Sequence, residues 1–282
     1  MRDLLAPLAV ERMCALLDVS RAGYYKFLGR GPSARDLRHD ALLREIRRIF
    51  LKSRCTYGVR RMHKEIVGTG FPCNRKTVAT LMHQSGIAPI RRRKFKSTTD
   101  SRHHLPVSKN LLNREFSGGE LHQVWMSDIT YVETKQGWLY LAVFIDRYSR
   151  QVVGWRADKE MTAELVLKAF EEAQVRTGTS PDLVHSDRGS QYASEAFRAK
   201  LNQAGCQQSM SRKGNCWDNA VAESFFGTIK SEMIYHATFD TREQAQLAIF
   251  DYIETFYNTN RLHSALKYQT PVEFALKGKK VA

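Results

Sequence analysis

The sequence has few cysteines and no long apolar run, and each shortage excludes a class of protein. The five cysteines among 282 residues include no Cys-x-x-Cys pair, so neither a disulfide framework nor a zinc ribbon is indicated, and a reducing cytoplasm fits. Because no run of about 18 apolar residues occurs, we expect no membrane span. The first residues, MRDLLAPLAVERMC, contain no basic region followed by a long apolar stretch, so we also expect no signal peptide.

Acidic residues are scarce in the first part of the chain. Residues 1–110 hold 24 basic and 8 acidic side chains, whereas residues 111–282 hold 20 and 21. The N-terminal part therefore carries the whole net charge of +15. A generic solubilising surface would not be confined to one part of the chain. The asymmetry favours a nucleic-acid-binding module that is joined to a near-neutral domain.

Apolar residues at helical spacing predict helices throughout the basic part. Residues 10–28 predict two short helices with Ser20 as the N-cap of the second, and residues 39–52 predict a longer one. Two more helices are expected on either side of a short glycine-containing turn that ends at Asn74.

Helix, turn and helix in this order are typical of a helix-turn-helix, whose second helix enters a major groove of DNA. Arg75 and Lys76 would lie at the start of that second helix. An ordinary helical hairpin has the same pattern, and the local positive charge favours DNA binding. We therefore assign residues 1–90 to a helical, basic, helix-turn-helix-like DNA-binding region.

A basic segment without periodicity divides the chain. It contains Arg91, Arg92 and Arg93 and continues as KFKSTTDSRHHLPVSKN. We predict that residues 91–118 form a linker whose first arginines follow a DNA backbone.

From about residue 119 the pattern changes to that of an α/β domain, which we extend to residue 282. Three strands joined by short turns are expected between residues 122 and 157. An amphipathic helix follows, then short strands at 182–187 and 206–211 that alternate with helices, and a long helix at 241–259. This order of elements is that of a ribonuclease-H-like fold, so function has to be argued from the site.

Three carboxylates stand in elements that such a fold brings together. Asp128 lies within the first strand, on the same face as apolar residues, where a charge needs compensation. Asp187 ends the strand VHSD, and Glu223 lies on the helix DNAVAESFFGTIK with Lys230 on its face. Asp187 could simply cap a turn, and the three could be separate surface acids. Their placement instead predicts a site for Mg²⁺ or Mn²⁺, with two ions supporting an in-line phosphoryl transfer.

A family resemblance is carried by several segments. QVWMSDITYV, GWLYLAVFIDRYSRQVVGW, VHSDRGSQY, GNCWDNAVAESFFGTIKSE and YNTNRLHSALKYQTPVEF, with SRAGYYKF and YGVRRMHKEI earlier in the chain, resemble the orfB transposases of bacterial insertion sequences of the IS-three family. These proteins are relatives of the retroviral integrases. The resemblance covers nearly the whole chain, and it includes the D, D-35-E spacing formed by Asp187 and Glu223.

The resemblance implies a role for each matching residue. Asp128, Asp187 and Glu223 would be the catalytic, metal-binding triad. Lys230 matches a basic residue that would hold a phosphate near the transposon end. Apart from the resemblance, Trp217 lies in a polar loop beside the site and is a candidate for stacking on a base.

Three further residues have expected roles outside the triad. Arg261 and His263 follow the last long helix and are further candidates for DNA contact. Asp218 is expected to cap a helix.

The function implied is a DNA transposase that cleaves at insertion-sequence ends and transfers strands with divalent metal. The partners implied are terminal inverted repeats and target DNA, a dimer or higher multimer, and an upstream orfA product fused by frameshifting. We expect a cytoplasmic, nucleoid-associated protein. The alternatives are a ribonuclease-H-like nuclease, which would hydrolyse without joining, and a non-catalytic helix-turn-helix regulator, which would bind DNA without metal-dependent chemistry.

Overall fold

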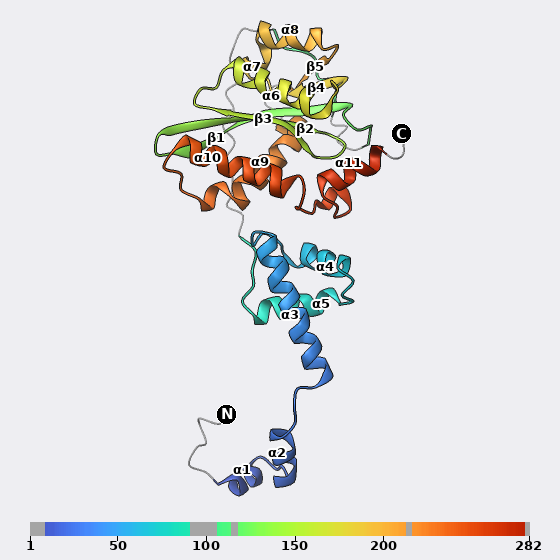
Figure 1. Cartoon of the computed structure of the whole chain (residues 1–282), viewed down its shortest axis with the longest axis vertical. Helices are drawn as coiled ribbons and strands as arrows, with labels where there is room; N and C mark the ends of the chain where they lie inside the picture. The colour runs from blue at the N-terminus through green and yellow to red at the C-terminus, as the bar shows by residue number, and fades with distance from the viewer. Residues whose placement is uncertain (1–8, 91–105, 114–117, 213–215, 280–282) are drawn as a thin grey trace.

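A computed structural model describes residues 9–90, 106–113, 118–212 and 216–279 of the chain. Its first five helices form a helical region, and the elements from β1 to α11 form a sheet domain (Figure 1). The helices of the helical region are α1 (Val10–Leu16), α2 (Arg21–Leu28), α3 (Ala34–Lys52), α4 (Val59–Gly68) and α5 (Arg75–Gln84).

Polar caps fix where these helices begin. The hydroxyl of Ser20 accepts a hydrogen bond from the Gly23 amide at the start of α2, as predicted. Helix α3 begins five residues before the predicted position, because Ser33 and Asp36 form a reciprocal capping box. Asn74 caps α5 by accepting from the Lys76 amide at 2.8 Å.

One apolar cluster holds α3, α4 and α5 together. Ile46 of α3, Met62 and Ile66 of α4 and Val78 of α5 are all fully buried in it. The same cluster includes Leu262, which belongs to the sheet domain. The helical region is therefore docked on the sheet domain through shared apolar packing, and Figure 1 shows α3–α5 beneath the layer of α9 to α11.

The sheet domain is built on five strands in the order β3-β2-β1-β4-β5. The strands are β1 (Val124–Thr134), β2 (Gly137–Asp146), β3 (Val152–Asp158), β4 (Leu183–Ser186) and β5 (Gln207–Met210). The first three pair antiparallel, as the short predicted turns require, whereas β4 pairs parallel with both β1 and β5.

Helices cover both faces of the sheet (Figure 1). One face carries α6 (Ala163–Thr177), α7 (Ser190–Ala193) and α8 (Glu195–Gln203), which pack on a core around Trp125, Phe144 and Phe170. The other face carries α9 (Ala220–Glu232) and α10 (Arg242–Phe250), which pack on the alternate side chains of β1 and β2. This is the expected ribonuclease-H-like arrangement.

The last long helix differs from the prediction of one continuous α-helix. After α10 the chain continues as a π-type segment, η3 (Asp251–Tyr257), with bonds that span five residues, such as the Asn258 amide to the Ile253 carbonyl. The wider turn keeps four aromatic or aliphatic side chains of η3 buried. Helix α11 (Pro271–Lys279) was not predicted, because its short segment carries little apolar periodicity.

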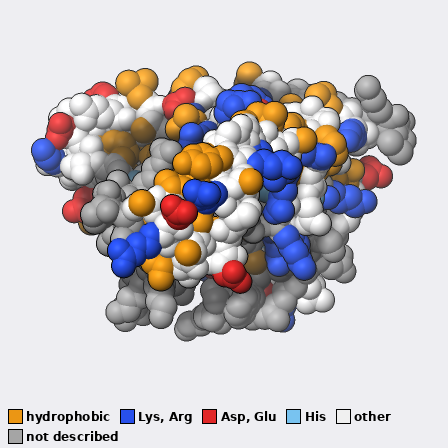
Figure 2. Space-filling model, turned by 90° about the horizontal axis from the view of Figure 1, so that it is seen from below, with side chains coloured by type: hydrophobic (Ala, Val, Ile, Leu, Met, Phe, Trp, Pro, Cys, Tyr) orange, Lys and Arg blue, Asp and Glu red, His pale blue; other side chains and the backbone are white. Residues whose placement is uncertain are grey.

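The face at the α1 and α2 end of the molecule is rich in cationic side chains. Figure 2 looks along the molecule from the end at which α1 and α2 lie, and Lys and Arg side chains clearly outnumber Asp and Glu on that face. Among the described residues, no helix combines the length and the apolar character that a bilayer crossing requires.

Candidate active site

Two neighbouring strands bring Asp128 and Asp187 side by side. Strands β1 and β4 are parallel, and Met126 pairs with His185. Asp128 and Asp187 each follow two positions later, so the same register places them opposite one another across the two strands. Asp187 lies just beyond the end of β4. Two carboxylates thus lie next to each other at the carboxyl end of β4, beside β1, as the sequence predicted. We call this place the β1–β4 opening.

Both carboxylates face the layer that contains α9. On β1 the side chains of Val124, Met126 and Val132 are buried in the core beneath α9 and α10, and alternation places Asp128 on that same face. Ser127 points to the other face, where its hydroxyl lies 2.8 Å from the Tyr192 hydroxyl of α7. The two acids are therefore aimed at the helix that carries Glu223.

Helix α9 presents Glu223 and Lys230 toward this pair. The charge of each residue acts on Asp128, Glu223 raising the pKa of that carboxyl and Lys230 lowering it. Glu223 is exposed, whereas Lys230 is only 5% exposed, and its ammonium lies 5.0 Å from the ring centroid of Tyr131. Lys230 therefore supplies a positive charge within the site rather than on an outer surface.

The site strongly disfavours a second negative charge. Burial and the neighbouring Asp187 raise the pKa of Asp128 well above its ordinary value. Partial desolvation of the Glu223 carboxyl raises its pKa, and burial lowers the pKa of Lys230. A protein that keeps two adjacent carboxylates ionised needs a cation between them.

Backbone amides hold both aspartates in place. The Ile129 amide donates to Asp128 Oδ1 at 2.8 Å, and the Gly189 amide donates to Asp187 Oδ1 at 2.9 Å. Bonds of this kind orient the acids before any ligand arrives.

The donor set suits a hard divalent cation. Carboxylate oxygens are the ligands that Mg²⁺ and Mn²⁺ prefer. Asn219, at the start of α9, adds a buried carboxamide oxygen that has no hydrogen-bond partner among the described residues. Within those same residues, no three His, Cys, Asp or Glu side chains are already gathered closely enough to hold an ion. From the strands, Asp128 and Asp187 would hold a metal, and Glu223 is the carboxylate that α9 would add.

Asn219 has a positioning role that sequence reasoning missed. Its Nδ2 donates to the Ser127 carbonyl at 3.0 Å, which ties the start of α9 to β1 one residue before Asp128. The signal was its place before the helix, four residues ahead of Glu223. The sequence predicts Asp218 as the helix cap, but its carboxylate instead accepts bonds from the Asn110 side chain and from the Arg212 amide.

The predicted DNA-contacting residues have different outcomes. Arg75 and Lys76 are exposed in the first turn of α5. Arg91, Arg92 and Arg93 lie outside the described residues. Trp217 belongs to the short 3-10 helix Cys216–Asn219, and its side chain lies outside the described part of the structure.

Arg261 is not placed to contact DNA. Its side chain is 2% exposed, and its guanidinium donates to both carboxylate oxygens of Glu232, at 2.8 and 2.7 Å. Glu232 is the last residue of α9, so Arg261 anchors the end of the helix that carries Glu223. His263 is half-buried, and its amide donates to the Gln269 carbonyl at 2.9 Å. An isolated NRLH segment gives no sign of this burial.

Comparison with known protein families agrees with both parts of the fold. A family described as an HTH-like domain matches residues 38–95. Two families described as integrase core domains match residues 120–216 and 223–277. The solved structure of the HTLV-2 integrase catalytic core domain in complex with magnesium covers 56% of this chain and 99% of its own, at 18% identity and a TM-score of 0.45. That likeness is too distant to support a functional conclusion.

Several curated relatives match almost end to end. The insertion element IS600 uncharacterized 31 kDa protein of Shigella sonnei is 42% identical over 93% of this chain and 97% of its own length. The transposase for insertion sequence element IS904 of Lactococcus lactis is 43% identical over 87% and 97%. The transposase InsF for insertion sequence IS3A of Escherichia coli is 39% identical over 95% and 94%.

Three findings indicate the same class of protein. They are these relatives, the two integrase core matches and the carboxylates at the β1–β4 opening. The protein is a DNA transposase, a polynucleotidyl transferase of the DDE class, and this class uses divalent metal. The chain belongs to the IS3 family of insertion-sequence transposases.

Proposed function

We propose that Asp128, Asp187 and Glu223 are the catalytic triad and that together they hold two Mg²⁺ ions, or Mn²⁺ in their place. When bound, such ions supply Lewis acidity to the attacking and leaving oxygens of a phosphoryl transfer. The observation that carries the proposal is the β1–β4 register, whose last pair, Met126 and His185, lies two positions before the two aspartates.

The chain's own residues orient the reacting groups. The amides of Ile129 and Gly189 fix the aspartates, and the Asn219 contact with Ser127 fixes the distance between α9 and β1. Lys230, buried beside the triad, holds the phosphate at a transposon end. The reaction has two steps, cleavage by water that frees a 3′-hydroxyl and attack of that hydroxyl on a phosphodiester, without a covalent enzyme intermediate.

The DNA partners are the terminal inverted repeats of the element and its target. Arg75 and Lys76 contact DNA from the start of α5. The DNA backbone is followed by Arg91, Arg92 and Arg93. Trp217 stacks on a base. In this proposal the DNA-binding region is residues 1–90, the linker 91–118 and the catalytic core 119–282. Pairing two ends requires at least a dimer, an upstream orfA product supplies end recognition, and the protein acts at the bacterial nucleoid.

Strand joining on a plasmid tests the proposal. A supercoiled plasmid with the element's own ends is incubated with Mg²⁺ or Mn²⁺ and either this chain or its fusion to the orfA product. Joined products are expected with the unchanged protein, and their loss is expected with EDTA and with Glu223→Gln. The loss should be 10³-fold or more, on the order of the effect of removing a group that acts only in the transition state.

A matched variant separates the triad from a general charge effect. Glu195→Gln removes an exposed glutamate from the first turn of α8, and joining should stay within about twofold because exposed substitutions of this kind change little. Nicked plasmid without joined product would support a nuclease instead. DNA binding without any metal-dependent product from either form would support a regulator. Full joining by Glu223→Gln would remove this residue from the triad.

A further inference from the structure

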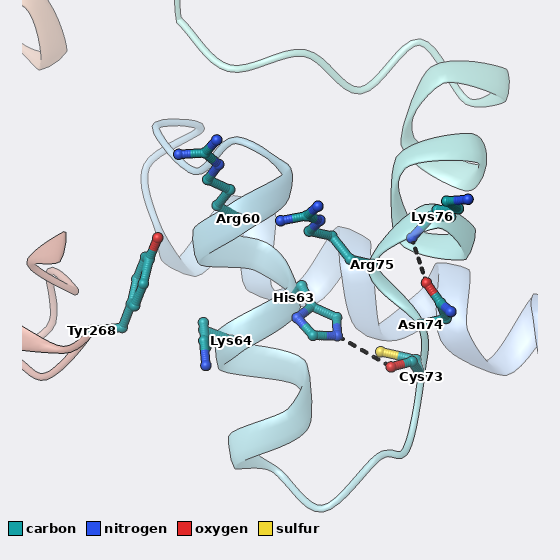
Figure 3. Close-up of a pocket in the computed structure, with 8 residues that line it drawn as sticks. All are labelled: Arg60, His63, Lys64, Cys73, Asn74, Arg75, Lys76 and Tyr268. Atoms are coloured by element: carbon teal, nitrogen blue, oxygen red, sulfur yellow. Dashed lines mark hydrogen bonds between the residues drawn. The ribbon is translucent and has the colours of Figure 1, made fainter.

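A basic pocket lies between the two helices of the helix-turn-helix and the sheet domain. Its volume is about 690 Å³. Arg60, His63 and Lys64 line it from α4, Asn74, Arg75 and Lys76 line it from the start of α5, and Tyr268 enters from the sheet domain (Figure 3). Two segments that are almost 200 residues apart in sequence thus build one surface.

The pocket gathers positive charge without a carboxylate. Among the residues that line it, four are exposed Lys or Arg and none is Asp or Glu. In the described part of the chain, Arg60, Arg75 and Lys76 form no ion pair. The acid of α4 that lies nearby, Glu65, is engaged with Lys52 of α3 at 3.3 Å. Four cations held together repel one another, so the arrangement favours a polyanion.

Backbone and ring donors around the pocket are already oriented. Asn74 caps α5, which leaves the positive end of a ten-residue helix at the pocket. The His63 ring lies with Nε2 3.1 Å from the Cys73 carbonyl, and this contact occupies that negative group on the pocket wall. Figure 3 shows Arg60 and Arg75 extending toward the same side of the pocket.

Tyr268 is held in the pocket by a strained turn. Lys267 and Tyr268 have φ values of +54° and +62°, a left-handed conformation that costs bulky residues on the order of 1 kcal/mol or more each. The turn is fixed by the Tyr268 amide, which donates to the His263 carbonyl at 3.0 Å. The Lys64 ammonium lies 5.7 Å from the Tyr268 ring centroid. The sheet domain therefore places a phenol beside the cations of α4 at the cost of backbone strain in this turn.

We propose that this pocket binds the phosphodiester backbone of duplex DNA, with Arg60, Lys64, Arg75 and Lys76 neutralising phosphates and the Tyr268 hydroxyl donating to one of them. The inference rests on the proposed function and adds to it. DNA engagement by the helix-turn-helix includes a residue of the catalytic domain, and α4 contributes as well as α5. Because phosphate contacts carry no sequence information, this site anchors the protein without choosing the sequence.

Salt-dependent binding of the full chain tests the site. All variants are made in a Glu223→Gln background so that the DNA stays intact. Fluorescence anisotropy measures the affinity for a labelled duplex between about 50 and about 300 mM NaCl, where the affinity changes steeply with salt. Removing two phosphate contacts with Arg60→Gln and Lys64→Gln should lower the slope of log affinity against log salt by about 1.8. At 0.1 M salt the same change weakens binding about 60-fold. Tyr268→Phe should weaken binding a few-fold and leave the slope unchanged, because it removes a neutral donor.

The matched control removes equal charge elsewhere. Arg198→Gln with Lys168→Gln takes two exposed cations from α8 and α6, on the far side of the sheet (Figure 1). This variant should keep the slope and the affinity. The losses in the pocket variant should be equal on two unrelated duplexes.

The possible results separate the pocket from the proposed function. An unchanged slope in the pocket variant, or a loss confined to one duplex sequence, overturns the backbone site even if the protein joins plasmid ends. A reduced slope in the pocket variant, together with no joined product from the protein that retains Glu223, supports the site and removes the proposed function. A Tyr268→Phe protein with unchanged affinity removes the sheet domain's part in binding.

Discussion

The buried pair of Arg261 and Glu232 offers a sharp test of how the catalytic helix is held. Arg261→Met keeps most of the side-chain volume and removes the charge. It leaves the carboxylate of Glu232, which is 9% exposed, with the Tyr252 hydroxyl as a hydrogen-bond donor at 2.7 Å and without its guanidinium. Although burial alone lowers the pKa of Arg261, its bonds to Glu232 raise that pKa above the ordinary value, so the charged pair is the stable form.

The expected cost follows from this geometry. Breaking a buried, bidentate ion pair by removing one partner costs about 3–5 kcal/mol, because a buried charge is left uncompensated. At about 2–4 °C per kcal/mol for a domain of this size, the melting temperature should fall by roughly 10 °C. Adding Glu232→Gln removes the stranded charge and keeps an acceptor for Tyr252. The double variant should therefore recover at least about 2 kcal/mol.

Urea unfolding followed by tryptophan fluorescence measures these differences, since Trp125 and Trp155 are buried in the sheet domain. The control is Arg176→Met. Arg176 contacts Glu254 at 2.6 Å, but its side chain is 30% exposed, so its loss should cost about 1 kcal/mol or less.

Two results would refute this account of the pair. If Arg261→Met costs no more than Arg176→Met, burial does not set the strength of the contact. If Glu232→Gln adds its own full cost to the double variant, the two residues are not coupled.

Two further predictions concern pH and packing. Burial, with the nearby Arg261, lowers the pKa of His263 from 6.5 to about 4. Below pH 6.5 the unfolded chain therefore binds more protons than the folded protein does. The contribution of the neutral His263 to the free energy of unfolding is fully present above pH 6.5 and is lost as the pH falls toward 4. Between pH 7 and pH 5 the unchanged protein should lose about 2 kcal/mol more than His263→Gln in urea titrations, and parallel pH profiles would contradict this. A Cβ on Gly154 would lie 2.6 Å from Ala173 Cβ and closer still to the Ala169 carbonyl, so Gly154→Ala should destabilise by about 1–3 kcal/mol in the same titration, and a cost below about 0.5 kcal/mol would mean that α6 moves freely away from β3.

The sheet and its helices were predictable because the local periodicity of apolar residues and the pairing of distant strands assign the same faces to the core. Apolar residues alternate along β1, and the face that alternation assigned to Val124, Met126 and Val132 is the one that packs under α9. Short turns required antiparallel neighbours, which β1, β2 and β3 are. The π-type segment η3 was not predictable, since an extra residue per turn is selected by aromatic packing that only the folded chain provides.

The site was predictable to the level of element and face, but not of exposure. Asp128 and Asp187 could be placed together because parallel strands share one edge. The burial of Lys230 and Arg261 could not be predicted. In the sequence, a Lys or Arg in a polar segment gives the same pattern whether it contacts DNA or a buried acid. The roles of the triad remain a prediction that strand joining will decide.

The contact between Tyr57 and Leu262 has a consequence for synthesis of the chain. The Tyr57 hydroxyl accepts from the Leu262 amide at 2.7 Å, across 205 positions of sequence. At ribosomal rates of about 5–20 residues per second, some 10–40 seconds separate the emergence of these two partners. During that interval α3–α5 can fold on their own apolar residues but have no surface on which to dock. A chain that stops before residue 251 would keep all three carboxylates and still lack the segment that joins its two halves.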